Sequence, residues 1–137
     1  MQTLTSLIED ILQSVRNEFG EKAELFKPIV LSMNALECAE FEATKVPGVY
    51  VFIHDELGCI KIGKSHSNVS KRALQHCGSD NTSSGDGLIQ MSKLLHCDKT
   101  HMLIFALQKG ESTHWVLALE HYLENTLKPR IPSKRNG

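Results

Sequence analysis

Residues 48–65 read GVYVFIHDELGCIKIGKS, and this stretch decides the fold. In its first half every second residue from Val49 to Ile53 is aliphatic, and in its second half Ile60 and Ile62 continue the alternation after a polar turn. A period of two is typical of β-strands. The stretch therefore predicts a β-hairpin with one aliphatic face.

The two aliphatic rows are expected to share that face, and this requirement fixes the parity of the strand pairing. One suitable pairing sets Val51 opposite Ile62 and Phe52 opposite Lys61. Tyr50 and Lys61 then lie on the other face as diagonal neighbours, about 6–8 Å apart at Cβ. Taken alone, such a pair is more often a surface tyrosine beside a solvated lysine.

Outward from the hairpin, the sequence predicts an α+β fold. Residues 4–19 have helical apolar spacing, with Thr5 or Ser6 as a cap and Gly20 as a stop, and residues 28–31 are a short extended candidate. We expect a small central antiparallel sheet, made of the hairpin plus a third strand and flanked by helices, with an N-terminal helical extension. The pattern further predicts helices at 68–76, 88–95 and 113–127, a polar loop at 79–87 and a buried strand at 102–107.

Composition places the chain among ordinary proteins with a core of their own. It has 137 residues, of which 41% are hydrophobic and 23% charged, and no apolar run long enough to span a bilayer. Four cysteines without a C-x-x-C pair, and a start unlike a signal peptide, favour an intracellular, cytoplasmic protein with free thiols. A zinc site from cysteines and histidines matches no familiar spacing.

Charge divides the chain into two parts. Residues 1–45, read as an N-terminal helical accessory segment, carry a net charge of −4, whereas residues 46–137, read as the main domain, carry +3. The later part is therefore the one expected to face phosphate.

Basic residues follow the hairpin and close the chain. Arg72 and His76 are four apart, so a helix places both on one face, where a guanidinium can grip phosphate and an imidazole can relay a proton. The tail carries Lys134, Arg135 and Asn136. In isolation, each group also fits a solvated basic surface.

A carboxylate lies within the apolar stripe of the last predicted helix. Glu120 is spaced −4, +3 and +7 from Val116, Leu123 and Leu127. A buried carboxylate costs free energy unless it is paired or binds a metal, and the stripe alone fits either role. Glu124 follows core-facing Leu123 and is expected to be solvated.

Together these residues resemble the GIY-YIG nuclease superfamily. Its first motif stands here as Gly48-Val49-Tyr50 and its second as Lys61-Ile62-Gly63, with lysine where the name motif has tyrosine. The ordered set is more specific than any single piece. The resemblance covers roughly residues 46–137, and its further members are Arg72 on a helix, Glu120 on a later helix and the terminal Asn136.

The resemblance implies a metal-dependent endonuclease that hydrolyses a DNA phosphodiester bond with one Mg²⁺ or Mn²⁺ ion. Glu120 would hold the ion. Tyr50 would orient or deprotonate the attacking water, helped by nearby cations. Arg72 would hold the scissile phosphate, Lys61 would add charge, His76 would position water or phosphate and Asn136 would hydrogen-bond within the site. Further substrate contacts are expected from Lys64, Lys71, Lys134 and Arg135.

Three alternatives remain open on the sequence. Lys61 is compatible with a GIY-YIG-like module that binds nucleic acid or regulates a partner without cutting. The N-terminal segment is compatible with a homodimer contact, and an unrelated enzyme using histidine and cysteine has no supporting spacing. The nuclease hypothesis requires Tyr50, Lys61, Arg72 and Glu120 to converge, and an acid across the sheet from the tyrosine hydroxyl would contradict the expected mechanism.

Overall fold

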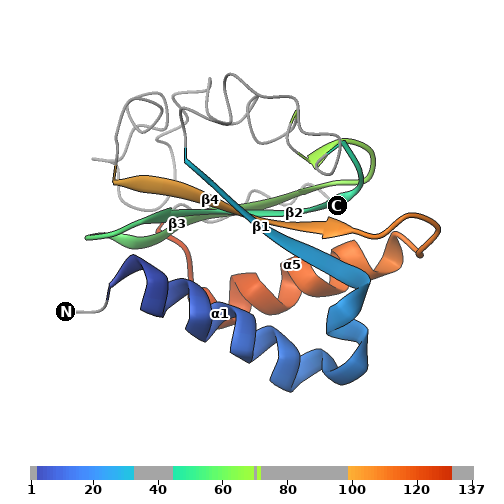
Figure 1. Ribbon diagram of the computed structural model, residues 1–137, viewed down its shortest axis with the longest axis horizontal. Helices are drawn as coiled ribbons and strands as arrows, with labels where there is room; N and C mark the ends of the chain where they lie inside the picture. Colours follow the sequence, from blue (N-terminus) through green and yellow to red (C-terminus); the bar gives the residue numbers. More distant parts are fainter. Residues whose placement is uncertain (1–2, 33–44, 70, 72–98, 131–137) are drawn as a thin grey trace.

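The computed structural model describes residues 3–32, 45–69, 71 and 99–130. The predicted α+β class is confirmed, with a four-stranded antiparallel sheet and two long helices (Figure 1). The predicted helix at 88–95, the loop at 79–87 and most of the helix at 68–76 lie outside the described residues. In chain order the elements are α1 (Leu4–Phe19), the 3-10 helix η1 (Gly20–Leu25), β1 (Phe26–Ser32), β2 (Gly48–His54), β3 (Gly58–Ser65), β4 (Thr100–Leu107) and α5 (His114–Leu127).

The sheet has the strand order β1-β4-β2-β3, so β3 is an outer strand. The predicted hairpin is β2 and β3, and its register is confirmed, with Val51 opposite Ile62 and Phe52 opposite Lys61. The predicted third strand is β4, which pairs with the other side of β2. Among the described strands, the hairpin joins the rest of the sheet through β2, and β3 is paired on one side only.

The first segment of the chain contributes to the same sheet. The extended candidate is confirmed as β1, which pairs with β4 over its whole length. Among the described strands β1 is an outer strand, paired on one side only, and such a strand can accommodate Pro28. Residues 26–32 thus share a sheet with residues 48–65 and 100–107.

Helix α1 is amphipathic and uses its apolar stripe within the chain. Ile8, Ile11 and Val15 are buried in a cluster with the sheet and α5. The cap is Thr3, whose hydroxyl accepts from the Ser6 amide at 3.1 Å, rather than Thr5 or Ser6 as expected. Because this stripe is packed on its own sheet, a homodimer through α1 would have to use the polar side of the helix.

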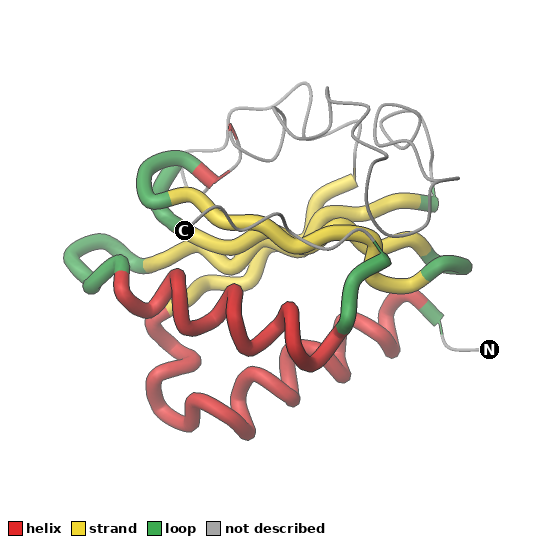
Figure 2. The backbone as a smooth tube through the Cα atoms, turned by 180° about the vertical axis from the view of Figure 1, so that it is seen from behind, coloured by secondary structure: helices red, strands yellow, loops and turns green. Residues whose placement is uncertain are grey.

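Both helices cover the same face of the sheet and lie side by side (Figures 1 and 2). The Tyr122 hydroxyl of α5 donates to the Ser14 carbonyl of α1 at 3.2 Å. We call this face of the sheet the helix face, and its hairpin residues are Val49, Val51, Ile53 and Ile62.

The other face of the sheet carries aromatic side chains and is also buried. Tyr50 and Phe52 are fully inaccessible there and pack edge-to-face, with ring centroids 5.4 Å apart. Ile60 was expected on the aliphatic face but packs with these rings, because the register shifts between Phe52 and Ile53. We call this the aromatic face. The hairpin is therefore a buried element on both sides, not a surface ribbon.

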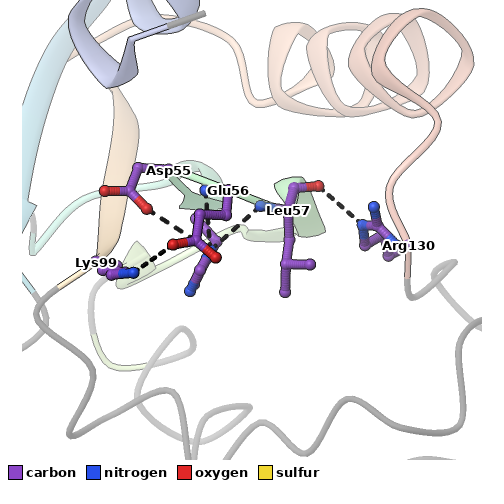
Figure 3. Close-up of polar contacts among 6 residues, drawn as sticks. Asp55, Glu56, Leu57, Lys99 and Arg130 are labelled. Carbon is purple, nitrogen blue, oxygen red and sulfur yellow. Dashed lines mark hydrogen bonds and ion pairs between the residues drawn. The ribbon is translucent and has the colours of Figure 1, made fainter. Parts of the chain in front are cut away.

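Three side chains make polar contacts with the β2–β3 turn, namely His54, Arg130 and Lys99 (Figure 3). His54 Nδ1 accepts from the amides of Glu56 at 3.1 Å and Leu57 at 3.2 Å. Arg130 donates its side-chain Nε to the Leu57 carbonyl at 2.8 Å and its amide to the Cys59 carbonyl at 3.2 Å. These bonds tie the segment after α5 to the start of β3.

Glu56 also pairs with Lys99, and this pair makes acid stability testable. The hydrogen bond and charge of Lys99 lower the pKa of Glu56. Because the folded pKa is the lower one, the pair stabilises the fold above the ordinary carboxyl pKa and stops doing so as pH falls through the lowered value. We expect Glu56→Gln to lower the urea midpoint slightly at about pH 7 and not at about pH 2. An equal loss of the urea midpoint at about pH 2 would contradict the role of the Glu56–Lys99 pair. Added salt should reduce the loss seen at about pH 7, because both side chains are exposed.

Within the described part of the chain, neither helix combines the length and the hydropathy that crossing a bilayer requires.

Candidate active site at the outer edge of the sheet

Glu120 lies among apolar side chains on α5, as its spacing predicted. Val116, Leu119 and Leu123 around it are fully buried, and Glu120 itself is only 4% exposed. Helix α5 packs on the helix face of the hairpin. A carboxylate in this position needs a compensating charge or ion, because burial alone disfavours its charged form.

The compensating charge comes from Lys64 on β3. Its Nζ lies 3.2 Å from Glu120 Oε1, and its side chain is 28% exposed. Lys64 pairs with Val49, so it projects on the helix face. From the sequence Lys64 was expected to contact the substrate, and its ion pair with Glu120 was not predicted. The alternation of the strand could have placed Lys64 on the helix face, because Lys64 is two residues from Ile62, which the pattern assigned to the aliphatic face.

Tyr50 lies on the other face and crosses β3 at Gly63. The two residues are paired in the ladder, and a Cβ added to Gly63 would lie 2.1 Å from the Tyr50 Oη. The hydroxyl is thus directly over the backbone of the outer strand. The phenol is fully buried, unlike the surface tyrosine that such a pair taken alone would more often contain.

Lys61 takes the predicted place beside this ring. It pairs with Phe52, next to the pairing of Val51 with Ile62, so Tyr50 and Lys61 are on one face as diagonal neighbours. Lys61 is half-buried. The predicted register of the hairpin and the shared face of Tyr50 and Lys61 are confirmed.

The acid and the phenol are on opposite faces of the sheet, contrary to the expected convergence in one cavity. Glu120 reaches Lys64 from the helix face, whereas Tyr50 covers Gly63 from the aromatic face. The physical reason is that α5 packs its apolar stripe on the aliphatic face of the hairpin, and Tyr50 has the other parity. Among the described strands β3 is an outer strand, so its edge at Gly63 and Lys64 borders both faces of the sheet.

The segment that follows β3 turns tightly into a helix beside this edge. The Ser65 hydroxyl accepts from the amides of Ser67 and Asn68, both at 3.1 Å, and Asn68 Oδ1 accepts from the Lys71 amide at 3.0 Å. Asn68 therefore caps the start of the predicted helix. Lys71, a predicted substrate contact, is exposed on its first turn. The other predicted site residues, Arg72, His76, Lys134, Arg135 and Asn136, lie outside the described residues.

A metal ion at this site would have one protein carboxylate. Among the residues that the structure describes, no three or more His, Cys, Asp or Glu side chains form a group that could hold an ion. Mg²⁺ keeps several waters and takes one or two carboxylates, so Glu120 could supply only the carboxylate, and its fully buried neighbours Val116, Leu119 and Leu123 supply no further ligand. Cys59 offers no thiolate at neutral pH, because burial and then the Glu124 charge raise its pKa to about 12.

Fold and site together define an α+β domain with a buried acid–lysine pair and a buried tyrosine at one sheet edge. No protein-family model, curated protein or solved structure matches the chain. The resemblance to the GIY-YIG superfamily therefore rests on the quoted residues.

Proposed function

We propose that this protein is a metal-dependent endonuclease of the GIY-YIG type that hydrolyses a DNA phosphodiester bond at the outer edge of β3. The observation that carries the proposal is the pair of Glu120, a buried carboxylate, with Lys64 at 3.2 Å on the strand of the second motif. An ion pair with a purely structural role could lie anywhere in the fold, whereas this pair lies beside the residues that resemble a nuclease signature.

The chemistry requires charge neutralisation as the phosphodiester gains negative charge toward the transition state. One Mg²⁺ or Mn²⁺ at Glu120 would supply Lewis-acid stabilisation of that charge. Lys64 and Lys61 add positive charge from the two faces of β3. Arg72 is proposed to grip the scissile phosphate, and His76 and Asn136 to position water and phosphate within the site.

Two-sided approach suits the geometry of phosphoryl transfer. The attacking and leaving oxygens lie roughly in line, on opposite sides of the phosphorus atom. In such a reaction Tyr50 would orient the attacking water from the aromatic face, and Glu120 would hold the ion from the helix face, where the ion would stabilise the added negative charge. This replaces the arrangement in one cavity that the sequence suggested. It requires the aromatic face to admit water near Gly63, because Tyr50 is fully buried as it stands.

A second candidate function is a domain that binds nucleic acid without cutting it. The complete burial of Tyr50, across the sheet from Glu120, favours this function, as does Lys61 in place of the motif's tyrosine. Lys61, Lys64 and Lys71 would then serve as phosphate contacts, which weaken as salt rises.

A cleavage assay distinguishes the two functions. It uses supercoiled plasmid, linear duplex and branched DNA, each in Mg²⁺, Mn²⁺ or EDTA. The nuclease hypothesis expects nicked and linear products with metal and intact DNA in EDTA. Salt-sensitive binding measured by fluorescence anisotropy, with intact DNA under every metal condition, would reject hydrolysis and leave the binding module. A matched RNA substrate shows whether DNA is the preferred polymer.

A further inference from the structure

We infer that a groove at the end of the sheet, beside Lys27 and Lys109, holds the DNA backbone at a distance from the edge of β3. This inference rests on the nucleic-acid binding in the proposed function, but on neither metal binding nor cleavage. It gives a phosphate contact to the first segment of the chain, whereas the charge distribution of the sequence placed phosphate on the later part.

The groove lies where β1 begins and β4 ends, and its volume is about 580 Å³. Hydrogen bonds between backbone groups join its walls. The Gln108 amide donates to the Leu25 carbonyl and the Leu107 amide to the Pro47 carbonyl, both at 2.8 Å. The groove is therefore formed by three segments whose relative positions are fixed. Its lining includes three apolar and three exposed charged residues: Val46, Ala106, Leu107, Glu24, Lys27 and Lys109.

The two lysines of the groove have no partner in the described part of the chain. Neither Lys27 nor Lys109 forms an ion pair or a side-chain hydrogen bond there. Lys64 and Lys99, in contrast, are held by glutamates. With Glu24 included, the two lysines give the described lining a formal charge of +1. The groove therefore complements an anion.

The groove continues from the candidate site along the aromatic face. Val46 and Ala106 pack in the cluster of that face, and Lys27 is paired with Ala106, so its side chain has the same direction. The Val69 amide donates to the Val46 carbonyl at 2.9 Å, and Lys71 follows two residues later. The segment that carries Lys71 thus connects the end of β3 to the wall of the groove.

The separation of the two regions suits one DNA duplex. The strand order places β1 three strands from β3. Adjacent strands are about 4.8 Å apart, so the groove is at least about 14 Å from the edge of β3. Each DNA strand carries one phosphate per about 3.4 Å of helix axis, so about four base pairs separate the two contacts. The apolar part of the groove suits the deoxyribose carbons between successive phosphates.

The test is duplex binding in EDTA, where neither metal binding nor cleavage takes part. Fluorescence anisotropy measures the affinity of the full chain for a fluorescein-labelled duplex of about 16 base pairs over a range of salt concentrations. We expect Lys27→Gln together with Lys109→Gln to weaken binding about tenfold at about 0.1 M salt. The slope of log affinity against log salt concentration should fall by about 2, one for each lost phosphate contact.

A variant of the opposite sign sharpens the test. Glu24→Gln removes a charge that repels phosphate, so it should tighten duplex binding about twofold. The groove should keep its shape in this variant, because the Gln108 side chain donates to the backbone carbonyl of Glu24 and not to its carboxylate.

The matched control is Lys22→Gln together with Lys128→Gln, which removes two charges from the helix side of the molecule. Both lysines are exposed, and the Lys22 Nζ lies 5.9 Å from the centroid of the Trp115 ring on α5. Screening limits exposed charges to a range of about 10 Å at about 0.1 M salt, so the affinity of the control should stay within about twofold of wild type.

The outcomes separate the groove from the proposed function. Wild-type affinity in the double variant of Lys27 and Lys109, or an equal loss in the control, would overturn the groove and leave the nuclease proposal intact. Groove-dependent binding by a protein that cuts no DNA in Mg²⁺ or Mn²⁺ would support the groove and reject the nuclease. An absence of duplex binding by wild type would overturn both. The substituted lysines are exposed, so the variants should fold, and urea unfolding verifies this.

Discussion

Glu120→Gln is expected to lower metal-dependent DNA cleavage by at least about a hundredfold while the protein stays folded. The substitution keeps the size and one acceptor oxygen of the side chain, so Lys64 can still donate to it. It removes the negative charge that a divalent ion needs. Plasmid nicking rates in Mg²⁺ and Mn²⁺ measure the effect, and circular dichroism with urea unfolding confirms that the variant is folded.

The matched control is Glu124→Gln, on the same helix one turn later. It makes the same change of charge and shape, but Glu124 is only half-buried, and the ion pair of Lys64 is with Glu120. We expect its cleavage rate to stay within about twofold of wild type. Full cleavage by folded Glu120→Gln would refute the assignment of Glu120, and an equal loss in both variants would attribute the effect to net charge or helix stability.

Local periodicity was sufficient to predict the hairpin and the burial of Glu120. Alternation with a period of two fixes strand parity, so Val51 opposite Ile62 followed from the sequence. Helical spacing likewise placed Glu120 in the apolar stripe that the structure confirms. Both features depend on residues a few positions apart, where side-chain direction is set by the backbone itself.

Features that depend on irregular or distant contacts were not predicted. Ile60 packs on the aromatic face because of a register shift that alternation cannot anticipate. The Lys64–Glu120 pair joins residues far apart in the chain and needs the packing of α5 on β3. The opposite placement of Tyr50 and Glu120 was implicit in the parity, because an apolar helix stripe must meet the aliphatic face of the hairpin and Tyr50 belongs to the other face.

Gly63→Ala is expected to cost about 3 kcal/mol or more of unfolding free energy, because it places a methyl group where the Tyr50 ring already lies. The new Cβ would be 2.1 Å from the Tyr50 Oη and 2.2 Å from its Cζ. The ring cannot withdraw easily, since it is fully buried and packs against Phe52. Urea denaturation at fixed pH measures the loss.

Two comparisons show whether the ring contact is the cause. Gly20→Ala is the control for backbone strain: among the described residues nothing beyond its chain neighbours lies within 4 Å of its added Cβ, and its φ of +57° with ψ of −130° strains an L-residue by about 1–3 kcal/mol. Tyr50→Leu, which shortens the side chain, should restore part of the stability of Gly63→Ala, with a coupling free energy of about 1 kcal/mol or more between the two positions. A Gly63→Ala variant as stable as wild type would mean that the ring moves aside freely. In that case the Tyr50 hydroxyl would not be held over the edge of β3, and its proposed place beside the attacking water would lose its physical basis.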